Sequence, residues 1–180
     1  LRPRPDLQVT TVVAPITVTS GGVIDVEFTV TNLGPVSTPT GGSRWTDAVY
    51  LSTNRQPGGI LLGQLSNGSA LEAGGAYHTH ATFQIPIAAS GEFFVVVQAD
   101  SGRQVDEYPQ EDNNHNSPAA ALVVDVTPVP RPDLVVQQVA VPVEAFDGNS
   151  IVVRYRVSNL GAGVTFPGSW SDTVWLTRAP

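Results

Sequence analysis

The sequence predicts an all-β protein: an immunoglobulin-like, seven-stranded β-sandwich followed by the beginning of a second copy. Three observations lead to this fold class. Apolar and polar residues alternate with a period of two in several short segments, Gly and Pro separate these segments, and Arg4-Pro5-Asp6-Leu7 recurs as Arg131-Pro132-Asp133-Leu134. Period-two alternation is typical of strands with one buried face, and a recurring segment indicates repeated structural units.

The clearest predicted strand runs from Val23 to Leu33. Its apolar and polar side chains alternate, so one face of the strand should be buried. The segment Ile151–Val157 repeats this pattern. The inward-facing set of the first of these strands is Ile24, Val26, Phe28 and Val30.

Six further strands complete the predicted first copy, at residues 7–14, 45–52, 60–65, 77–85, 93–100 and 120–126. Turn-forming pairs such as Gly21-Gly22, Pro57-Gly58 and Gly74-Gly75 punctuate them. Seven short strands in a segment of this length favour a β-sandwich. The chain has no Cys, so it lacks the Cys-Trp-Cys signature of true immunoglobulin domains.

The repeat sets the predicted domain boundaries. Residues 1–4 are interpreted as the tail of a preceding linker, 5–127 as a complete sandwich, 128–131 as a Pro-rich linker and 132–180 as the N-terminal part of a second copy. The Trp45–Leu51 segment recurs as Trp170–Leu176, which adds a third strand to that part. Three explanations of the incomplete copy stay open: a cut in a longer polypeptide, completion by strands of another chain, or a frayed half-domain.

Composition excludes several classes of function. The chain has 180 residues, nine Arg, no Lys and a net charge of −7, and an acidic chain repels the phosphates of nucleic acids. No apolar run approaches the length of a membrane-spanning helix. The absence of Cys excludes disulfides, thiolate zinc sites and cysteine nucleophiles.

An ordered set of motifs resembles the CARDB family, the cell adhesion related domain found in bacteria. The motifs are Pro-Asp-Leu at the start, Thr29 to Gly34, Trp45 to Ser52, Leu61 to Gly63, Ala99-Asp100, and the acidic run from Val105 to Asn114. The resemblance covers residues 5–127 and again 132–177. It implies a sandwich module of large secreted or surface-attached proteins, often in tandem.

An acid-rich loop is the main candidate for a binding site. Calcium takes six to eight oxygen ligands from carboxylates, amide carbonyls and backbone, and this loop is rich in them. Alternatively, the loop is a solvated hairpin in which Asn side chains form turns and one Glu pairs with an Arg. The predicted calcium ligands are Asp100, Asp106, Glu107, Glu111, Asp112 and Asn113.

Other polar and aromatic residues favour structural roles. His78 and His80 share the wetter face of a strand, where a zinc or copper site would need a third ligand. Trp45 should lie in the core rather than in a sugar-binding platform. We expect Asp47 to bond to nearby backbone or to the acidic loop. Tyr50 should lie on the other face of its strand, where contact with a neighbouring module or ligand is the alternative to a structural role.

These patterns predict a non-catalytic, extracellular structural or adhesion module of a large bacterial surface or secreted repeat protein. No nucleophile elbow, phosphate-binding loop or metalloprotease helix occurs in the sequence. The alternatives are a carbohydrate- or ligand-binding accessory module of a secreted enzyme and a metal-dependent hydrolase. The expected partners are neighbouring repeats, a cell-surface or matrix ligand, and another copy that completes the second repeat.

Overall fold

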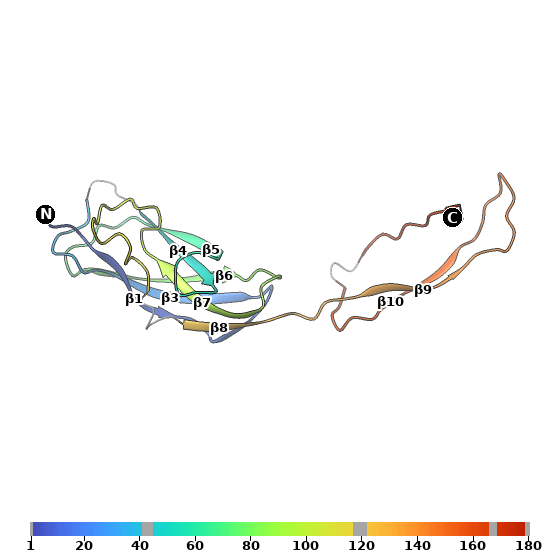
Figure 1. Cartoon of the computed structure of the whole chain (residues 1–180), viewed down its shortest axis with the longest axis horizontal. Coiled ribbons are helices and arrows are strands. Elements are labelled where there is room, and N and C mark those ends of the chain that lie inside the picture. Colours follow the sequence, from blue (N-terminus) through green and yellow to red (C-terminus); the bar gives the residue numbers. More distant parts are fainter. Residues whose placement is uncertain (1, 41–44, 117–121, 166–168, 179–180) are drawn as a thin grey trace. The chain divides into compact units, whose positions relative to one another are not determined.

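The computed structural model describes residues 2–40, 45–116, 122–165 and 169–178. The chain divides into two compact units, residues 1–128 and 129–180, and the boundary lies inside the predicted linker. The described residues form strands and no helices (Figure 1), so none of them belongs to a helix that could cross a membrane. The strands are β1 Leu7–Val13, β2 Thr17–Thr19, β3 Val23–Asn32, β4 Trp45–Ser52, β5 Ile60–Asn67, β6 Ala76–Gln84, β7 Gly91–Gln98, β8 Leu122–Thr127, β9 Leu134–Ala140 and β10 Arg154–Asn159.

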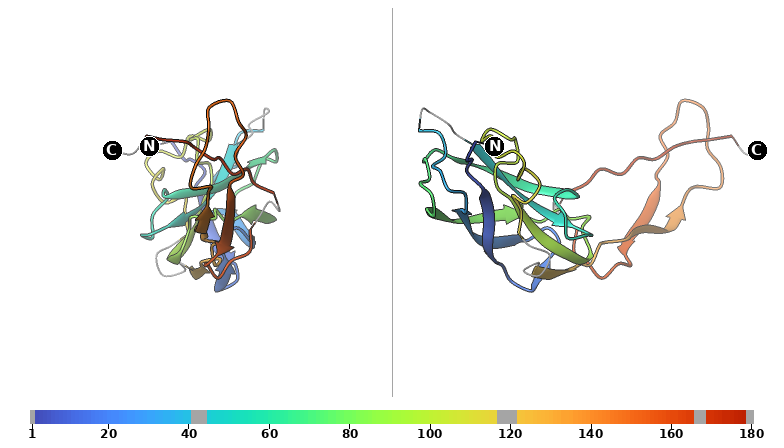
Figure 2. Two further views of the ribbon diagram at one scale, coloured as in Figure 1. Left: turned by 90° about the vertical axis from the view of Figure 1, so that its right-hand side faces the viewer. Right: turned by 60° about the vertical axis from the view of Figure 1, so that its left-hand side comes forward.

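The first unit is the predicted β-sandwich. An antiparallel sheet in the order β1-β3-β6 faces a five-stranded sheet in the order β2-β8-β7-β4-β5 (Figure 2). The unit has eight strands instead of seven because the short β2 pairs in parallel with β8. Three residues are too few to show an alternation, so β2 could not be predicted from this pattern. Ala120 and Ala121, assigned to the last predicted strand, lie outside the described residues.

The core of the first unit lies between these two sheets. The inward-facing set predicted from the alternation is fully buried, and Asp25 and Glu27 on the same strand are exposed. Trp45 is fully buried as well, which confirms its predicted place in the core. The residues that meet β3 from the other sheet are mainly aliphatic: Val49, Leu51, Val95, Val97, Val124 and Val126.

The described residues of the second unit form one antiparallel pair, β9 and β10. Leu134 pairs with Asn159, just as Leu7 pairs with Asn32 in the first unit. Each pair also has one irregularity in its register. The register shifts at Thr10 between β1 and β3, and it shifts at the matching Gln137 between β9 and β10.

The third strand expected in the second unit is not formed. The segment from Trp170 to Leu176 has no strand assignment. Its counterpart, β4, pairs with β5 and β7, and residues 129–180 hold no described equivalent of either strand. The predicted strand at Ile151–Val157 forms later, as β10 over Arg154–Asn159. Without partners on both edges, the backbone of such a segment has no ladder of hydrogen bonds to join.

Candidate functional site

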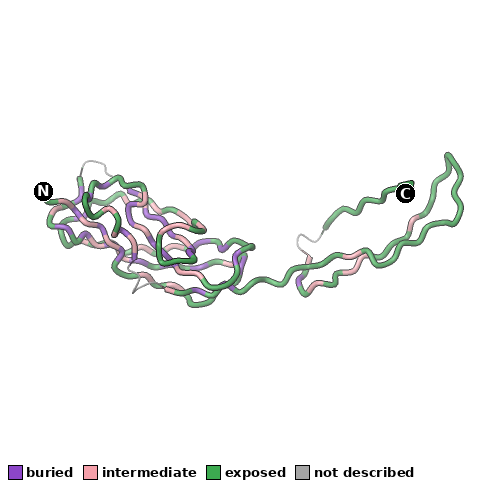
Figure 3. Tube along the Cα trace, viewed as in Figure 1, coloured by how far each residue is buried: buried purple, intermediate pink, exposed green. Residues whose placement is uncertain are grey.

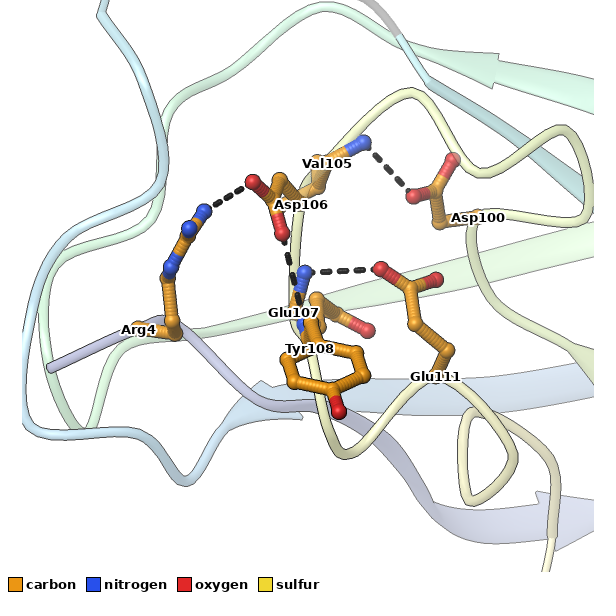
Figure 4. A network of polar contacts seen from close by, with 7 residues as sticks. All are labelled: Arg4, Asp100, Val105, Asp106, Glu107, Tyr108 and Glu111. Carbon is orange, nitrogen blue, oxygen red and sulfur yellow. Dashed lines mark hydrogen bonds and ion pairs between the residues drawn. The ribbon is translucent and has the colours of Figure 1, made fainter. Parts of the chain in front are cut away.

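The acidic loop, residues 100–114, leaves the end of β7 and begins in a strained turn. Asp100 has φ 44° and Arg103 has φ 53°, both in the left-handed region that non-glycine residues seldom adopt. The carboxylate of Asp100 accepts hydrogen bonds from the backbone N–H groups of Gln104 and Val105, each at 2.7 Å. Figure 4 shows the bond from Val105. Asp100 therefore stabilises the turn, because each of its two carboxylate oxygens accepts a backbone hydrogen bond.

Asp47 anchors the start of this loop from the neighbouring strand β4. Its Oδ1 accepts the backbone N–H of Asp100 at 3.1 Å, and its Oδ2 accepts the hydroxyl of Tyr77. Trp45 Nε1 in turn donates to the Tyr77 hydroxyl at 3.2 Å. Burial raises the pKa of Asp47 to about 6. The structure thus agrees with the expectation that Asp47 bonds to backbone at the acidic loop.

Glu107 connects the middle of the loop to the first strand. It is fully buried, and its Oε1 accepts the backbone N–H of Leu7 at 2.8 Å. Its Oε2 accepts a hydrogen bond from the side-chain amide of Asn114. Burial, with a smaller contribution from the nearby carboxylates of Asp100 and Glu111, raises the pKa of Glu107 to about 7.

Three buried oxygen atoms in the loop have no hydrogen-bond donor among the described residues. They are Glu111 Oε2, Asn113 Oδ1 and Asn114 Oδ1. Glu111 Oε1, by contrast, accepts the backbone N–H of Glu107 at 2.8 Å (Figure 4). A buried polar atom without a partner destabilises a fold by about 1–3 kcal/mol. A bound cation would satisfy such oxygens, and oxygen atoms are the ligands that calcium takes.

The cavity beside these oxygens is small and polar. It measures about 230 Å³, and Glu111 and Asn114, but not Asn113, contribute to its lining together with Arg103, Asp112 and His115. Burial raises the pKa of Asp100, and the nearby carboxylate of Glu111 adds a smaller increase, so the two carboxylates repel each other. A divalent cation between them would reverse that repulsion.

The structure separates the predicted ligands into two groups. Asp106 forms an ion pair with Arg4 on the surface, and Asp112 forms one with Arg103 at 3.3 Å. The Asp112 side chain is 95% exposed. The other four predicted ligands (Asp100, Glu107, Glu111 and Asn113) have buried or half-buried side chains.

No group of three or more Asp, Glu or His side chains within the described ranges is arranged to hold a metal ion. Any cation here would therefore need amide oxygens beside carboxylates. Asn114 supplies one such oxygen and is only 3% exposed. The predicted ligand set omitted Asn114, although its position directly after Asn113 in the acid-rich run was a usable signal.

The remaining candidates lie on the surface or in the core. His78 and His80 lie on the outer face of β6, each 3.8 Å from a carboxylate oxygen of Glu27 or Asp25. No third metal ligand joins them in the part of the chain that the structure describes. Trp45 is buried and so cannot stack on a sugar, while Tyr50 is half-buried.

Comparison with known proteins points to one family. The CARDB family matches residues 4–118. The crystal structure of a CARDB domain from Pyrococcus furiosus, in complex with di-metal ions, is 21% identical to the chain. It aligns over 72% of this chain and 99% of that one with a TM-score of 0.50, which supports the fold alone.

Two further structures have TM-scores too low for an argument. A solution structure of the same archaeal domain has 22% identity and a TM-score of 0.49, covering 70% of this chain and 98% of that one. A β-glucosidase from Listeria innocua in complex with glucose has 16% identity and a TM-score of 0.41, covering 68% of this chain and 16% of that one. No curated protein sequence matches the chain.

Proposed function

Since this chain belongs to the CARDB family, a family of adhesion-related, non-enzymatic modules, we propose that it is a structural and adhesive module of a large extracellular protein. In this proposal the module is one of several repeats of a bacterial surface or secreted protein. The repeats would hold other domains at a distance or contact a surface ligand. The net charge of −7 would help such an array to stay soluble.

One observation carries the proposal: the acidic loop fixes the place where the chain enters the module. Glu107 holds the backbone of Leu7, and Asp106 pairs with Arg4 just before the first strand. A groove of about 510 Å³ lies where this entering segment meets the loop, and both contribute to its lining. A module that holds the chain segment before its first strand in a fixed direction limits bending at the junction with a preceding module. This property suits a spacer.

The cellular location can be tested directly. An antibody against the first unit should label intact cells that produce the full-length protein. Protease treatment of the intact cells should remove that label and leave a cytoplasmic control protein unaffected. Labelling that requires cell lysis would contradict the extracellular location.

The calcium part of the proposal rests on the three buried oxygens without donors. Glu111, Asn113 and Asn114 would supply them, and backbone carbonyls or water would complete the six to eight ligands that calcium takes. Asp100 and Glu107 would add negative charge from the interior. Asp106 and Asp112, which pair with arginines on the surface, would contribute only long-range attraction.

Thermal unfolding in millimolar calcium and then in chelator tests this site. Calcium at a hundredfold excess over its dissociation constant would stabilise the native state by about 2.7 kcal/mol. Glu111→Gln should abolish the shift, because it removes the charge from the oxygen without a donor. Asp112→Asn is the matched control and should keep the shift. An identical melt in calcium and chelator would rule out the ion and leave the module role untouched.

A further inference from the structure

The last residue of β5 begins the tripeptide Asn67-Gly68-Ser69. Asn67 pairs with Trp45 of β4 and is half-buried. Gly68 and Ser69 are exposed, like most residues in the connections between the strands of the first unit (Figure 3). Of the eight Asn residues in the chain, Asn67 alone is followed by Gly. This position therefore combines an amide side chain with a following residue that has no side chain.

Two atoms at this position can react with each other: the backbone nitrogen of Gly68 and the side-chain carbonyl carbon of Asn67, Cγ. A bond between them closes a five-membered ring. A side chain on the following residue would crowd this approach, and glycine has no Cβ. Among the residues that the structure describes, none accepts a hydrogen bond from the N–H of Gly68. The nitrogen is therefore not held away from Cγ by a bond of its own.

The turn after Asn67 polarises the carbonyl group that this nitrogen would attack. Asn67 Oδ1 accepts the backbone N–H of Ser69 at 2.9 Å. When a nucleophile adds to Cγ, negative charge develops on Oδ1, and an N–H group that already points at this oxygen stabilises the charge. The local fold thus favours addition at Cγ.

The leaving group would be the side-chain nitrogen of Asn67. Nδ2 is buried and has no hydrogen-bond acceptor among the described residues, an arrangement that destabilises a folded protein. Asn32 Nδ2, by contrast, donates to the backbone carbonyls of Val36, Leu71 and Glu72. Loss of the nitrogen from Asn67 therefore breaks no hydrogen bond of the fold.

We infer that Asn67 is a site of deamidation, a covalent modification whose only reactants are this chain and water. The nitrogen of Gly68 forms a bond to Asn67 Cγ and gives up its proton, the bond from Cγ to Nδ2 breaks, and Nδ2 leaves as ammonia. Water then opens the ring at one of its two carbonyl carbons. Attack at Cγ gives Asp, whereas attack at the main-chain carbonyl carbon gives isoaspartate. No atom is oxidised or reduced.

The products change the end of β5. Each reacted chain carries one more negative charge, and in isoaspartate the backbone is one carbon atom longer, which disturbs the pairing with Trp45. The side-chain amide of Asn67 lies near the hydroxyl of Tyr77, and that hydroxyl donates to the buried Asp47. A carboxylate in place of the amide would repel the carboxylate of Asp47. The reacted chain should therefore be less stable, with the loss at the β4–β5 pair.

Ageing of the full chain in buffer tests the site. Cleavage after Arg places Asn67 in a peptide of residues 56–103, which contains no other Asn. In mass spectrometry this peptide should gain the mass difference between an NH2 group and an OH group before any other Asn-containing peptide changes. The rate should rise about tenfold per pH unit, because the attacking nitrogen must lose its proton. The product should contain both Asp and isoaspartate.

Gly68→Ala and Asn67→Gln are the matched control variants. The first adds a side chain to the attacking residue, and the second moves the carbonyl group one methylene too far for a five-membered ring. Each variant should keep its amide while the unsubstituted chain reacts to completion. The melting temperature of the aged unsubstituted chain should fall, and those of the aged variants should not. Calcium plays no part in the reaction, so every sample is kept in chelator.

Several results would overturn the inference. One is a peptide of residues 56–103 that keeps its mass while other Asn-containing peptides react. Another is an unchanged rate in a Gly68→Ala chain that melts like the fresh protein. A product that contains Asp without isoaspartate would mean direct attack of water on Cγ instead of ring closure. A fully reacted chain that melts like the fresh one would contradict the effect on β5.

Discussion

The two units contain the same strand pair in different surroundings. In the first unit, β1 and β3 lie under a second sheet, and Phe28 is fully buried. In the second unit, β9 and β10 keep the register, but Tyr155 at the place of Phe28 is 42% exposed. The comparison shows that nearby sequence determines pairing and turns, whereas a core requires strands that are distant in the sequence.

Truncation of the matched aromatic residue should have the largest effect on this comparison. Phe28→Ala should lower the free energy of unfolding of the first unit by about 3–5 kcal/mol, because it removes a large side chain from a closed core. Tyr155→Ala should change the stability of the same chain by less than about 0.5 kcal/mol. Denaturant unfolding of both variants, followed by circular dichroism, measures the difference. Equal losses would mean that the second unit already has a core.

The matched asparagines give the next largest effect. Asn32 is buried and bonds to the backbone of five residues: Asp6, Gly34, Val36, Leu71 and Glu72. Asn32→Ala should therefore cost the first unit about 3 kcal/mol, since several buried groups lose their partner. Asn159→Ala should leave the melt of the first unit unchanged and only speed amide exchange near Gly161. A mild Asn32→Ala phenotype would show that water replaces the lost bonds.

The pH dependence of stability should also separate the two units. The pKa of Glu107 is raised to about 7 and that of Asp47 to about 6, so folding favours their protonated forms. This stabilisation is complete below the unfolded-state pKa values near 4 and is lost as the pH rises through 6 to 7. The first unit should thus lose roughly 1–3 kcal/mol between pH 4 and pH 8 in chelator.

Glu107→Gln should flatten much of this pH dependence, because the amide does not titrate. Asp106→Asn, next to it but on the surface, is the matched control and should preserve the slope. The second unit has no buried carboxylate among its described residues, so exchange in β9 should follow only the intrinsic effect of pH. A stability that rises between pH 4 and pH 8 would contradict the raised pKa values.

The smallest effect concerns the surface of the acidic loop. Arg103→Gln removes the ion pair with Asp112, whose side chain is 95% exposed. Exposed pairs of this kind contribute less than about 1 kcal/mol, so the melt should shift by no more than a degree or two. A larger loss would mean that the left-handed turn at Arg103 matters more than its charge.

Sequence patterns predicted the sandwich because alternation in β3 and its neighbours is a local signal. They did not reveal which acids of the loop point inward. Glu107 is buried because its partner is Leu7, which lies 100 residues away. Asp106, its neighbour, is exposed because Arg4 meets it at the surface. The spacing in the sequence does not indicate which of the two acids is buried. Only the tertiary structure distinguishes the buried Glu107 from the exposed Asp106.

The parallel pairing of β2 with β8 has a consequence for a module under mechanical tension. Thr17, Val18 and Thr19 lie beside Asp125, Val126 and Thr127 in parallel, and Ser20 N donates to Thr127 O at 2.9 Å. Once β1 is detached from β3, a pull on both ends of the unit would draw β2 and β8 in opposite directions along their length. The hydrogen bonds between them then carry the load together in shear instead of opening one at a time. The short β2–β8 pair would thus resist a pull that is applied to the two ends of the module.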